Sequence, residues 1–399
     1  MLVVVLGIAL VPGSAAGSGP RWTPTWTASP HAPTGLLGPS WGPEGFDDQT
    51  VRQVVRISEG GSAMRIRLSN AYGSAPLVVT GATVARAGEG AAVRPGTVRH
   101  VTFRGHRSVT VPVGGEVVGD LARLPVAPLS RVTVTLYLAG RTGPATGHVL
   151  GATSWRASGE HRADVAAGAF TEASQSWFYL DAVEVVDVAP RRDVVVAFGD
   201  SITDGAFSTP DADNRYPDEL AERFGGRRAV VNAGIGGNRV LDDSPCFGEK
   251  ATSRFERDAL SWSGVRTVIV LLGVNDIGMS RFPFVCAPPI PVVTAGALID
   301  GYRELIGRAR ARGVRVVGGT VLPFKGSIIH DESGEAVRDE VNAWIRTSGE
   351  FDAVVDFERA VVDPADPDAL RPAFDSGDHL HPNDAGYRVM AEAVDLSVL

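Results

Sequence analysis

Hydrophobic and polar residues alternate along much of the first half of the chain. Hydrophobic residues alternate with arginines over 64–68, and with threonine and tyrosine over 132–138. A period of two predicts strands with one face on a core and the other in water. Further strand-like runs cover 51–58, 77–85, 96–103, 108–113 and 177–186. Because glycine, proline and serine separate the runs and no helical stripe intervenes, we expect an antiparallel, jelly-roll-like β-sandwich domain over residues 22–189.

The pattern changes after residue 190. Short unbroken apolar runs, typical of strands buried on both faces, occur at 194–198, 229–231, 268–272, 314–317 and 353–355. Helix-like stretches lie between them. The clearest spans 294–312 and ends at Gly313, and a last helix begins near Asn383. Strands that alternate with helices predict a parallel sheet covered on both sides, here over residues 191–399.

In such a sheet, ligands bind beyond the carboxyl ends of the strands, so the residues after each apolar run are candidates for chemistry. Ser201 follows the first run, where a strand-to-helix turn can present its hydroxyl; the alternative is an Asx-type turn that caps a helix. The glycine-rich segment 232–238 follows the second run. Its N–H groups could bind a developing oxyanion or cradle a phosphate, although the residues of a P-loop or dinucleotide motif are missing.

Two further segments carry candidate groups. Asn275 follows the third run and offers a side-chain amide donor, unless it merely caps the next segment. Asp378 and His381 lie three residues apart, so a carboxylate could orient an imidazole that acts as general base. The alternatives are a metal site built on Asp378, His379 and His381, or an ordinary surface loop.

Taken together and in this order, the four segments resemble the SGNH hydrolases, also called the GDSL esterase/lipase family. Residues 199–205 match the first block with Ser201, Gly237 matches the second, Asn275 the third, and Asp378 with His381 the last. The resemblance covers about 193–399 and implies a three-layer α/β/α, flavodoxin-like domain. The β-rich first half is similar to N-terminal domains of large secreted actinobacterial members.

The resemblance also implies a mechanism. Ser201 is the nucleophile, His381 takes its proton, and Asp378 holds the imidazole. The N–H groups of Ser201 and Gly237 and the amide of Asn275 bind the oxyanion, and no metal or cofactor is needed.

Neighbouring polar residues have weaker claims on the chemistry. Asp200 and Asp276 are expected to be structural hydrogen-bond acceptors and His379 a spacer, while Asp204, Asn238 and Arg239 could line the cleft. Four tryptophans of the first half could stack on sugars, although core packing is favoured; they are Trp22, Trp26, Trp155 and Trp177.

Composition and the N-terminus narrow the class of protein. A formal net charge of −8 argues against nucleic acid or an anionic membrane as partner. Residues 1–17 form an apolar run followed by small residues, which predicts a signal peptide and an extracellular protein; a lipoprotein or single-span anchor is the alternative. No later segment is apolar enough to span a membrane. Cys246 and Cys286 could pair after export, or stay as buried thiols.

The sequence therefore predicts a secreted serine esterase that acts on short acyl esters or acetylated carbohydrate. The absence of an evident amphipathic lid makes a lipase or phospholipase the second choice. A glycan-binding protein with an inactive hydrolase domain, and a metalloesterase, are the alternatives from other classes. The sequence does not determine the oligomeric state.

Overall fold

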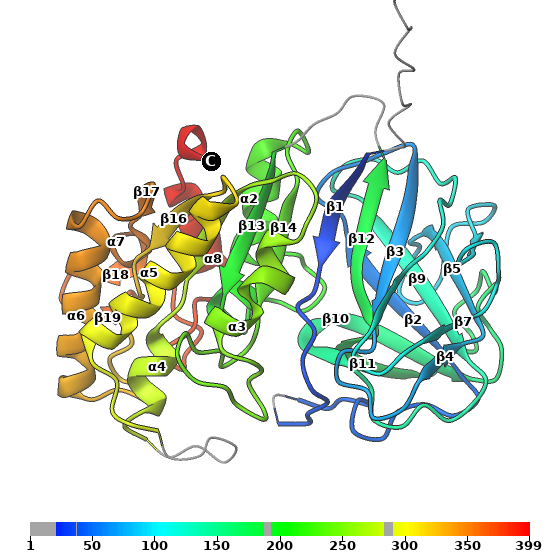
Figure 1. The fold of residues 1–399 in the computed structure, drawn as a ribbon, viewed down its shortest axis with the longest axis horizontal. Helices are drawn as coiled ribbons and strands as arrows, with labels where there is room; N and C mark the ends of the chain where they lie inside the picture. Colours follow the sequence, from blue (N-terminus) through cyan, green and yellow to red (C-terminus); the bar gives the residue numbers. More distant parts are fainter. Residues whose placement is uncertain (1–20, 37, 187–192, 283–289) are drawn as a thin grey trace, which may run out of the picture.

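The fold is described from a computed structural model, which describes residues 21–36, 38–186, 193–282 and 290–399. The predicted signal peptide, Cys286 and the predicted domain boundary at 189–191 lie outside these residues, so those predictions stay predictions. Figure 1 shows a β-rich half beside a half in which strands and helices alternate.

The β-rich half consists of antiparallel sheets. The two main sheets have the strand orders β1-β12-β3-β8 and β11-β10-β2-β9-β5-β6, and β4 pairs with β7. The strands are β1 (Trp22–Thr27), β2 (Gln49–Arg56), β3 (Ala63–Ser69), β4 (Leu77–Val79), β5 (Gly81–Arg86), β6 (Arg99–Val101), β7 (Val109–Val111), β8 (Glu116–Val118), β9 (Arg131–Leu138), β10 (Gly147–Ser158), β11 (Glu172–Phe178) and β12 (Leu180–Val186).

Inward residues of both main sheets share one hydrophobic core, as expected for a sandwich. Ile66 and Leu68 of β3 belong to the same cluster as Val134 and Leu136 of β9, and all four are fully buried. Trp26 and Trp177 are buried in it too, with ring centroids 4.8 Å apart. The antiparallel β-rich half predicted from the alternating pattern is thus confirmed.

Several strand limits differ from the prediction. The run 77–85 is divided into β4 and β5, and the run 177–186 is divided between β11 and β12. The second division occurs at Tyr179, whose φ of +60° breaks the extended backbone. Residues 177–180 are all hydrophobic and all buried, so the hydrophobic pattern carries no signal of this turn.

The second half contains a five-stranded parallel sheet with the order β14-β13-β15-β16-β17. Its strands are β13 (Val194–Gly199), β14 (Val230–Gly234), β15 (Val265–Leu271), β16 (Arg315–Gly319) and β17 (Ala353–Val355), and a small pair is formed by β18 (Val362–Asp363) and β19 (Asp366–Leu370). Because β13 lies between β14 and β15, the chain reverses direction across the sheet at β13. The segments that follow β13, β14 and β15 therefore begin side by side at the carboxyl edge of the sheet.

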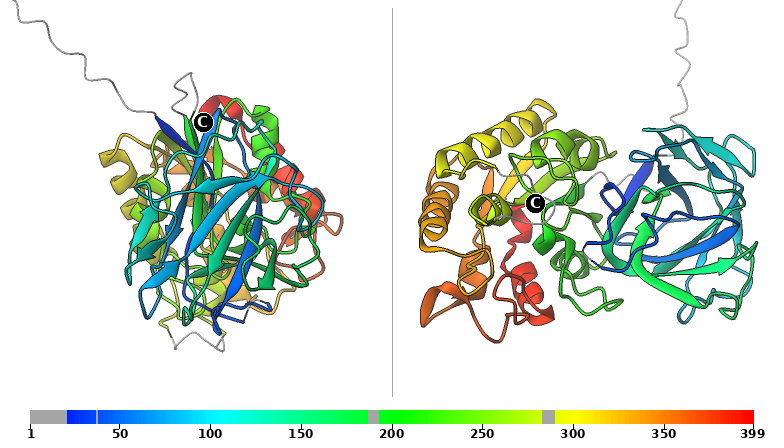
Figure 2. Two further views of the ribbon diagram at one scale, coloured as in Figure 1. Left: turned by 90° about the vertical axis from the view of Figure 1, so that its right-hand side faces the viewer. Right: turned by 90° about the horizontal axis from the view of Figure 1, so that it is seen from below.

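Helices cover both faces of this sheet (Figures 1 and 2). The helices α3, α4, α5 and α6 contact one another in one layer, and α2, α7 and α8 contact one another in the other. Their bounds are α1 (Ser201–Asp204), α2 (Tyr216–Phe224), α3 (Ala251–Phe255), α4 (Val274–Met279), α5 (Ala295–Ala311), α6 (Glu332–Thr347), α7 (Phe357–Val361) and α8 (Asp384–Ala393), with a π-helical turn η1 (Glu256–Leu260) after α3 and a 3-10 turn η2 (Leu396–Val398) at the end. The predicted α/β fold class is confirmed.

The helix predicted over 294–312 is α5, and its N-cap is Thr294, whose side chain accepts a hydrogen bond from the N–H of Ala297. Leu298, Leu305 and Ala309 lie on its buried face, as their spacing predicts. The described helices include none that combines the length and the apolar character needed to cross a membrane.

The two halves are joined by buried polar contacts. The Thr27 hydroxyl donates to the Asn232 carbonyl over 2.7 Å, and the Val230 N–H donates to the Ser58 hydroxyl over 3.1 Å. These bonds place β1 beside β14 (Figure 1). Because buried polar groups need partners, the halves are held in a defined orientation.

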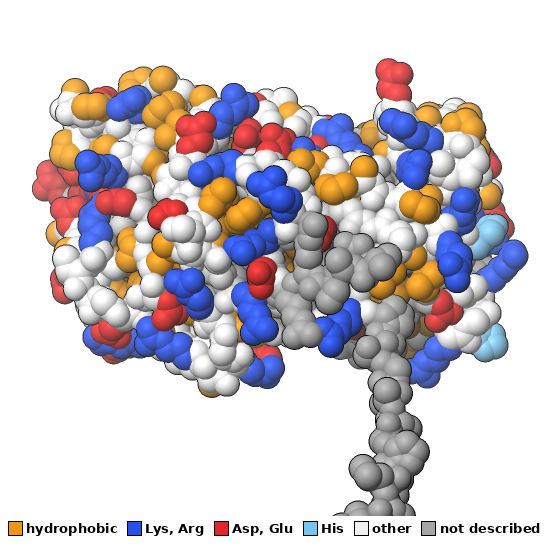
Figure 3. Space-filling model, turned by 90° about the horizontal axis from the view of Figure 1, so that it is seen from above, with side chains coloured by type: hydrophobic (Ala, Val, Ile, Leu, Met, Phe, Trp, Pro, Cys, Tyr) orange, Lys and Arg blue, Asp and Glu red, His pale blue; other side chains and the backbone are white. Residues whose placement is uncertain are grey.

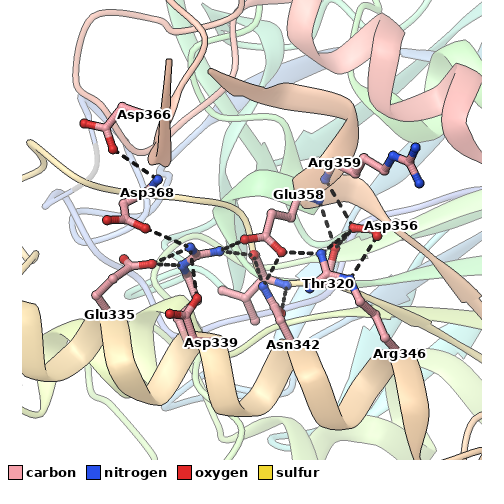
Figure 4. A network of polar contacts seen from close by, with 12 residues as sticks. Thr320, Glu335, Asp339, Asn342, Arg346, Asp356, Glu358, Arg359, Asp366 and Asp368 are labelled. Carbon is pink, nitrogen blue, oxygen red and sulfur yellow. Dashed lines mark hydrogen bonds and ion pairs between the residues drawn. The ribbon is translucent and has the colours of Figure 1, made fainter. Parts of the chain in front are cut away.

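A polar network fixes the loop that follows β16 (Figure 4). Arg338 of α6 is 1% exposed and forms ion pairs with Glu335 and Glu358. Asn342, one turn further along α6, exchanges two hydrogen bonds of 2.8 Å with the backbone of Val321. The network thus ties α6 and α7 to the first residue of the loop 321–330, which reaches the cleft described below.

On the face shown in Figure 3, the visible basic and acidic side chains are interspersed over both halves of the molecule. This mixed arrangement agrees with a modestly acidic protein in which many arginines pair with carboxylates, as in the ion pair between Arg65 and Glu184.

Candidate active site

Ser201 is the first residue of α1, directly after the buried strand β13. Asp200 caps this short helix: its carboxylate accepts the Ile202 N–H over 3.0 Å. Burial raises the pKa of Asp200 to about 7. Gly205 ends the turn with φ of +98°, a conformation that glycine adopts most readily. The serine hydroxyl is thereby presented at the carboxyl end of the sheet.

His381 reaches Ser201 from the segment before α8. The distance from His381 Nε2 to Ser201 Oγ is 2.7 Å, and that from His381 Nδ1 to Asp378 Oδ2 is 2.5 Å. Both are hydrogen-bond distances, so one imidazole connects a hydroxyl to a carboxylate. The structure therefore brings together three side chains that are far apart in the sequence.

The Asp378 carboxylate is held by several donors. Its Oδ1 accepts the N–H groups of Leu380 and His381 and the hydroxyl of Ser376, over 2.8–3.0 Å. Partial burial alone would raise the pKa of Asp378, but the hydrogen bonds from His381 and the backbone outweigh it and lower the pKa below its ordinary value. This carboxylate stays ionised across the neutral range and can orient an imidazole.

Two candidate hydrogen-bond donors lie in the same cleft as Ser201. Gly237 has φ of +72°, and a Cβ on it would lie 2.3 Å from the Phe247 ring, so only glycine fits. Asn275 is 2% exposed, and its Nδ2 donates to the Asn238 carbonyl over 3.1 Å. Because an amide nitrogen carries two hydrogens, the second N–H remains available to a bound group.

The cleft has a volume of about 630 Å³, within the usual range for small-molecule sites. Its walls are mainly apolar, and Phe207 stacks on His381 with a centroid distance of 5.1 Å. All five predicted site residues line it. The lining residues are Leu36, Leu150, Ser201, Ala206, Phe207, Gly236, Gly237, Phe247, Asn275, Met279, Gly326, Ser327, Ile328, Ile329, Gly377, Asp378, His379, Leu380 and His381.

The other polar residues noted in the sequence have separate contacts. The imidazole of His379 is hydrogen-bonded to Asp375, with 2.6 Å between Nδ1 and Oδ2. The backbone of His379 has φ of +61°. Asp276 is buried and accepts the N–H groups of Val240 and Leu241. Burial raises the pKa of Asp276 to about 7. The described residues contain no group of three or more His, Cys, Asp or Glu placed to hold a metal ion.

By their position in the sequence Asp204, Asn238 and Arg239 could line the cleft, but none of the three is among its lining residues. Asp204 is buried and lies 2.9 Å from His148 of the β-rich half. The Asn238 amide donates to the carbonyls of Phe247 and Glu249 over 2.9 and 2.8 Å, which fixes the loop after β14.

Sequence reasoning missed most of the cleft wall, including three hydrophobic residues next to the predicted site. Phe207 lies in the turn after α1, and Leu36 and Leu150 come from the β-rich half. An aromatic residue soon after the candidate nucleophile was a usable signal for Phe207. The two leucines carry no such signal, because only the packing of one half on the other brings them to Ser201.

Residues 197–389 match the model of the GDSL-like Lipase/Acylhydrolase family. No curated protein matches the chain.

Similar solved structures each cover half of this chain. They are a putative lipolytic protein of the G-D-S-L family from Desulfitobacterium hafniense (21% identity, 50% of this chain and 96% of that chain, TM-score 0.38), the aryl esterase of M. smegmatis (17% identity, 50% and 95%, TM-score 0.41) and Est24, a carbohydrate acetylesterase from Sinorhizobium meliloti (16% identity, 50% and 95%, TM-score 0.39).

The second half of the chain therefore belongs to the GDSL-like lipase/acylhydrolase family, as its sequence motifs predict. This half makes the protein a carboxylic ester hydrolase. The match begins in β13 and ends within α8, and so leaves the β-rich half outside the family domain.

Proposed function

We propose that the protein is a serine esterase in which Ser201 is the nucleophile, His381 the general base and Asp378 the residue that orients the imidazole. One observation carries the proposal: the 2.7 Å distance between Ser201 Oγ and His381 Nε2, with Asp378 on the other ring nitrogen. A hydroxyl is a weak nucleophile unless a neighbouring base removes its proton. This arrangement supplies that base.

The reaction proceeds in two halves. Ser201 Oγ attacks the ester carbonyl carbon while its proton passes to His381 Nε2. The tetrahedral intermediate bears its negative charge on the former carbonyl oxygen, where the N–H groups of Ser201 and Gly237 and the Asn275 amide stabilise it. The carbon–oxygen bond to the alcohol then breaks, and His381 protonates the leaving oxygen. Water, activated by His381, hydrolyses the acyl-enzyme and releases the acid.

We propose short acyl esters, including acetylated carbohydrate, as the substrates. A second candidate, an esterase or lipase for longer acyl chains, is favoured by one observation. Phe207 and Ile328 line the cleft with 61% and 79% of their surfaces exposed, so an apolar chain could bury them. A series of p-nitrophenyl esters separates the candidates: rates that fall steeply beyond acetate support the first, and rates that rise with chain length support the second.

The triad is tested on the same panel with Ser201→Ala. We expect hydrolysis to fall by three or more orders of magnitude, since the nucleophile is lost. Ser253→Ala is the matched control, because Ser253 is exposed on α3, away from the cleft. Ester turnover by Ser201→Ala at the wild-type rate would overturn the proposal.

We also propose that the protein is exported. The apolar segment 1–17 and the cysteines Cys246 and Cys286 support this. Expression of the full chain in a bacterial host tests it: we expect the protein outside the cytoplasm with the first residues removed. Protein retained in the cytoplasm with Met1 intact contradicts export.

A further inference from the structure

The β-rich half takes part in the cleft around Ser201. Leu36 and Leu150 line the same cavity as Ser201 and His381, although both lie in the half that is outside the family domain. Leu150 belongs to β10 and Leu36 to the loop after β1. The cleft is therefore completed by the packing of the two halves.

Leu150 projects from a bulge in β10. Val149 pairs with Ser176 of β11 and Ser154 pairs with Ser174, so the residues 150–153 of β10 face only one residue of β11. The pairing of β10 with β2 begins at Ser154, after the bulge. Leu150 has φ of +62°, a rare conformation for a residue with a branched side chain. Bulges of this kind often redirect a side chain beside an active site.

Residues of the hydrolase half hold the bulge in place. Arg215 Nη2 donates to the Leu150 carbonyl over 3.1 Å. Asp211 accepts the Thr153 N–H over 2.7 Å and the Thr153 hydroxyl over 2.5 Å. Since the bulge is bonded at both ends to the half that carries Ser201, the position of Leu150 relative to the nucleophile is fixed.

The bulge is connected to the imidazole of His381 through Phe207. His381 must protonate the leaving oxygen, so the alcohol portion of an ester lies next to the imidazole. Phe207 stacks on that imidazole. Phe207 and Leu150 together line a second, smaller cavity, which adjoins the main cleft because both cavities share these two residues and Ala206.

Leu150 also borders a cavity that lies in the β-rich half. This third cavity, of about 300 Å³, is lined by Leu150 and by residues of β11 and the loop near Pro39. Its lining contains no ionisable residue among the described residues; it consists of Gly38, Pro39, Val149, Leu150, Thr153, Ala173, Ser174, Gln175 and Ser176. An uncharged ligand group fits such a lining better than a charged one.

We propose that the β10 bulge, through Leu150, forms the alcohol-side subsite of the esterase and selects esters of bulky, uncharged alcohols. This inference rests on the proposed serine-esterase function and adds the role of the β-rich half to it. Leu150 is a specificity-determining residue that contacts the alcohol, and the acyl group lies against the opposite wall.

The test varies the alcohol at constant acyl group. For Leu150→Ala and Leu150→Asn, we expect kcat/KM on 2-naphthyl acetate to fall about fivefold to twentyfold, since apolar contact with the ring is lost. On ethyl acetate, kcat/KM should stay within about twofold of wild type, which also shows that the variants fold. Asparagine tolerates positive φ, so the second variant removes the apolar contact without added backbone strain. Leu121→Ala, an exposed leucine of the same half outside these cavities, should leave both substrates unchanged.

The outcomes separate this inference from the proposed function. A loss of kcat/KM on 2-naphthyl acetate alone supports the subsite. The subsite is overturned if both acetates lose equally, if neither loses, or if the loss grows from ethyl acetate to ethyl octanoate. These outcomes are interpreted after Ser201→Ala has been shown to abolish turnover of both acetates. Turnover that survives Ser201→Ala overturns the proposed mechanism itself and identifies a different failure.

Discussion

At the scale of single residues, hydrogen bonding gives chemically identical side chains different properties. Asp200 and Asp276 are fully buried, and burial raises the pKa of each to about 7. Asp378 is only partly buried, and the donors around it lower its pKa instead. In the proposed mechanism the aspartate that must stay charged is thus the one at the cleft, while the other two hold the backbone of the loops.

Asn275 offers the most direct test of oxyanion stabilisation. Asn275→Ala should lower kcat by about 10²–10³ with little change in KM, because the amide N–H acts on charge that exists only in the transition state. Steady-state kinetics on p-nitrophenyl acetate measure both constants. Asn214→Ala, in the same half but outside the cleft, is the control. A change confined to KM contradicts the assigned role.

His31 predicts a pH-dependent stability. Its Nε2 accepts the Val149 N–H, and burial, followed by the nearby His148, lowers its pKa to about 4. Between pH 6.5 and 4, His31 therefore binds a proton in the unfolded chain but stays neutral in the folded chain. This difference in pKa contributes about 3 kcal/mol to the free energy of unfolding. The contribution is present above pH 6.5 and is lost as the pH falls toward 4.

His31→Asn removes that titration. Urea unfolding at pH 7, 5.5 and 4.5 should show a destabilised variant at pH 7 whose difference from wild type shrinks as the pH falls. A difference that stays constant over this range would show that His31 does not titrate as described.

At the scale of elements, regular segments follow from the sequence and irregular ones do not. The spacing of apolar residues predicts α5 and the strands of the parallel sheet. The segments after three of those strands predict Ser201, Gly237 and Asn275, and the three-residue spacing of Asp378 and His381 predicts the other two cleft residues. The β10 bulge has no such signal. Leu150 looks like an ordinary strand leucine, yet its φ is +62°, and the bulge is bonded to the other half by Arg215, at the Leu150 carbonyl, and by Asp211, at Thr153. Contacts between distant parts of the chain cannot be read from local periodicity.

The network around α6 should stabilise the loop 321–330. Arg338→Met leaves Glu335 and Glu358 without their buried partner, so the free energy of unfolding should fall by about 3 kcal/mol or more. Arg303→Ala removes exposed ion pairs and should lower the free energy of unfolding much less than Arg338→Met does. Urea unfolding measures both. Equal small effects would mean that the network adds little to stability.

At the scale of the whole molecule, the two halves share buried polar groups beside the nucleophile helix. His148 of β10 contacts the Ser29 carbonyl through Nδ1 and Asp204 of α1 through Nε2, over 2.8 and 2.9 Å. Asp204 lies one turn after Ser201. The β-rich half therefore contacts the turn that carries Ser201 and also lines the cleft.

Loss of this contact should weaken the whole protein. His148→Ala leaves the buried Asp204 carboxylate without its partner, and we expect the free energy of unfolding to fall by about 3 kcal/mol. His161→Ala, which removes a partly exposed pair with Asp164, should cost less than about 1 kcal/mol. Chemical denaturation followed by tryptophan fluorescence compares them. A loss for His148→Ala no larger than for His161→Ala would contradict the coupling.

The central claim is that His381 activates Ser201 for covalent attack. The most direct measurement is peptide mass spectrometry after reaction with a fluorophosphonate, which traps an activated serine. We expect one adduct, on Ser201, in wild type and in His379→Ala, and no adduct in His381→Ala. An active enzyme that stays unlabelled, or one labelled at another residue, would contradict the account.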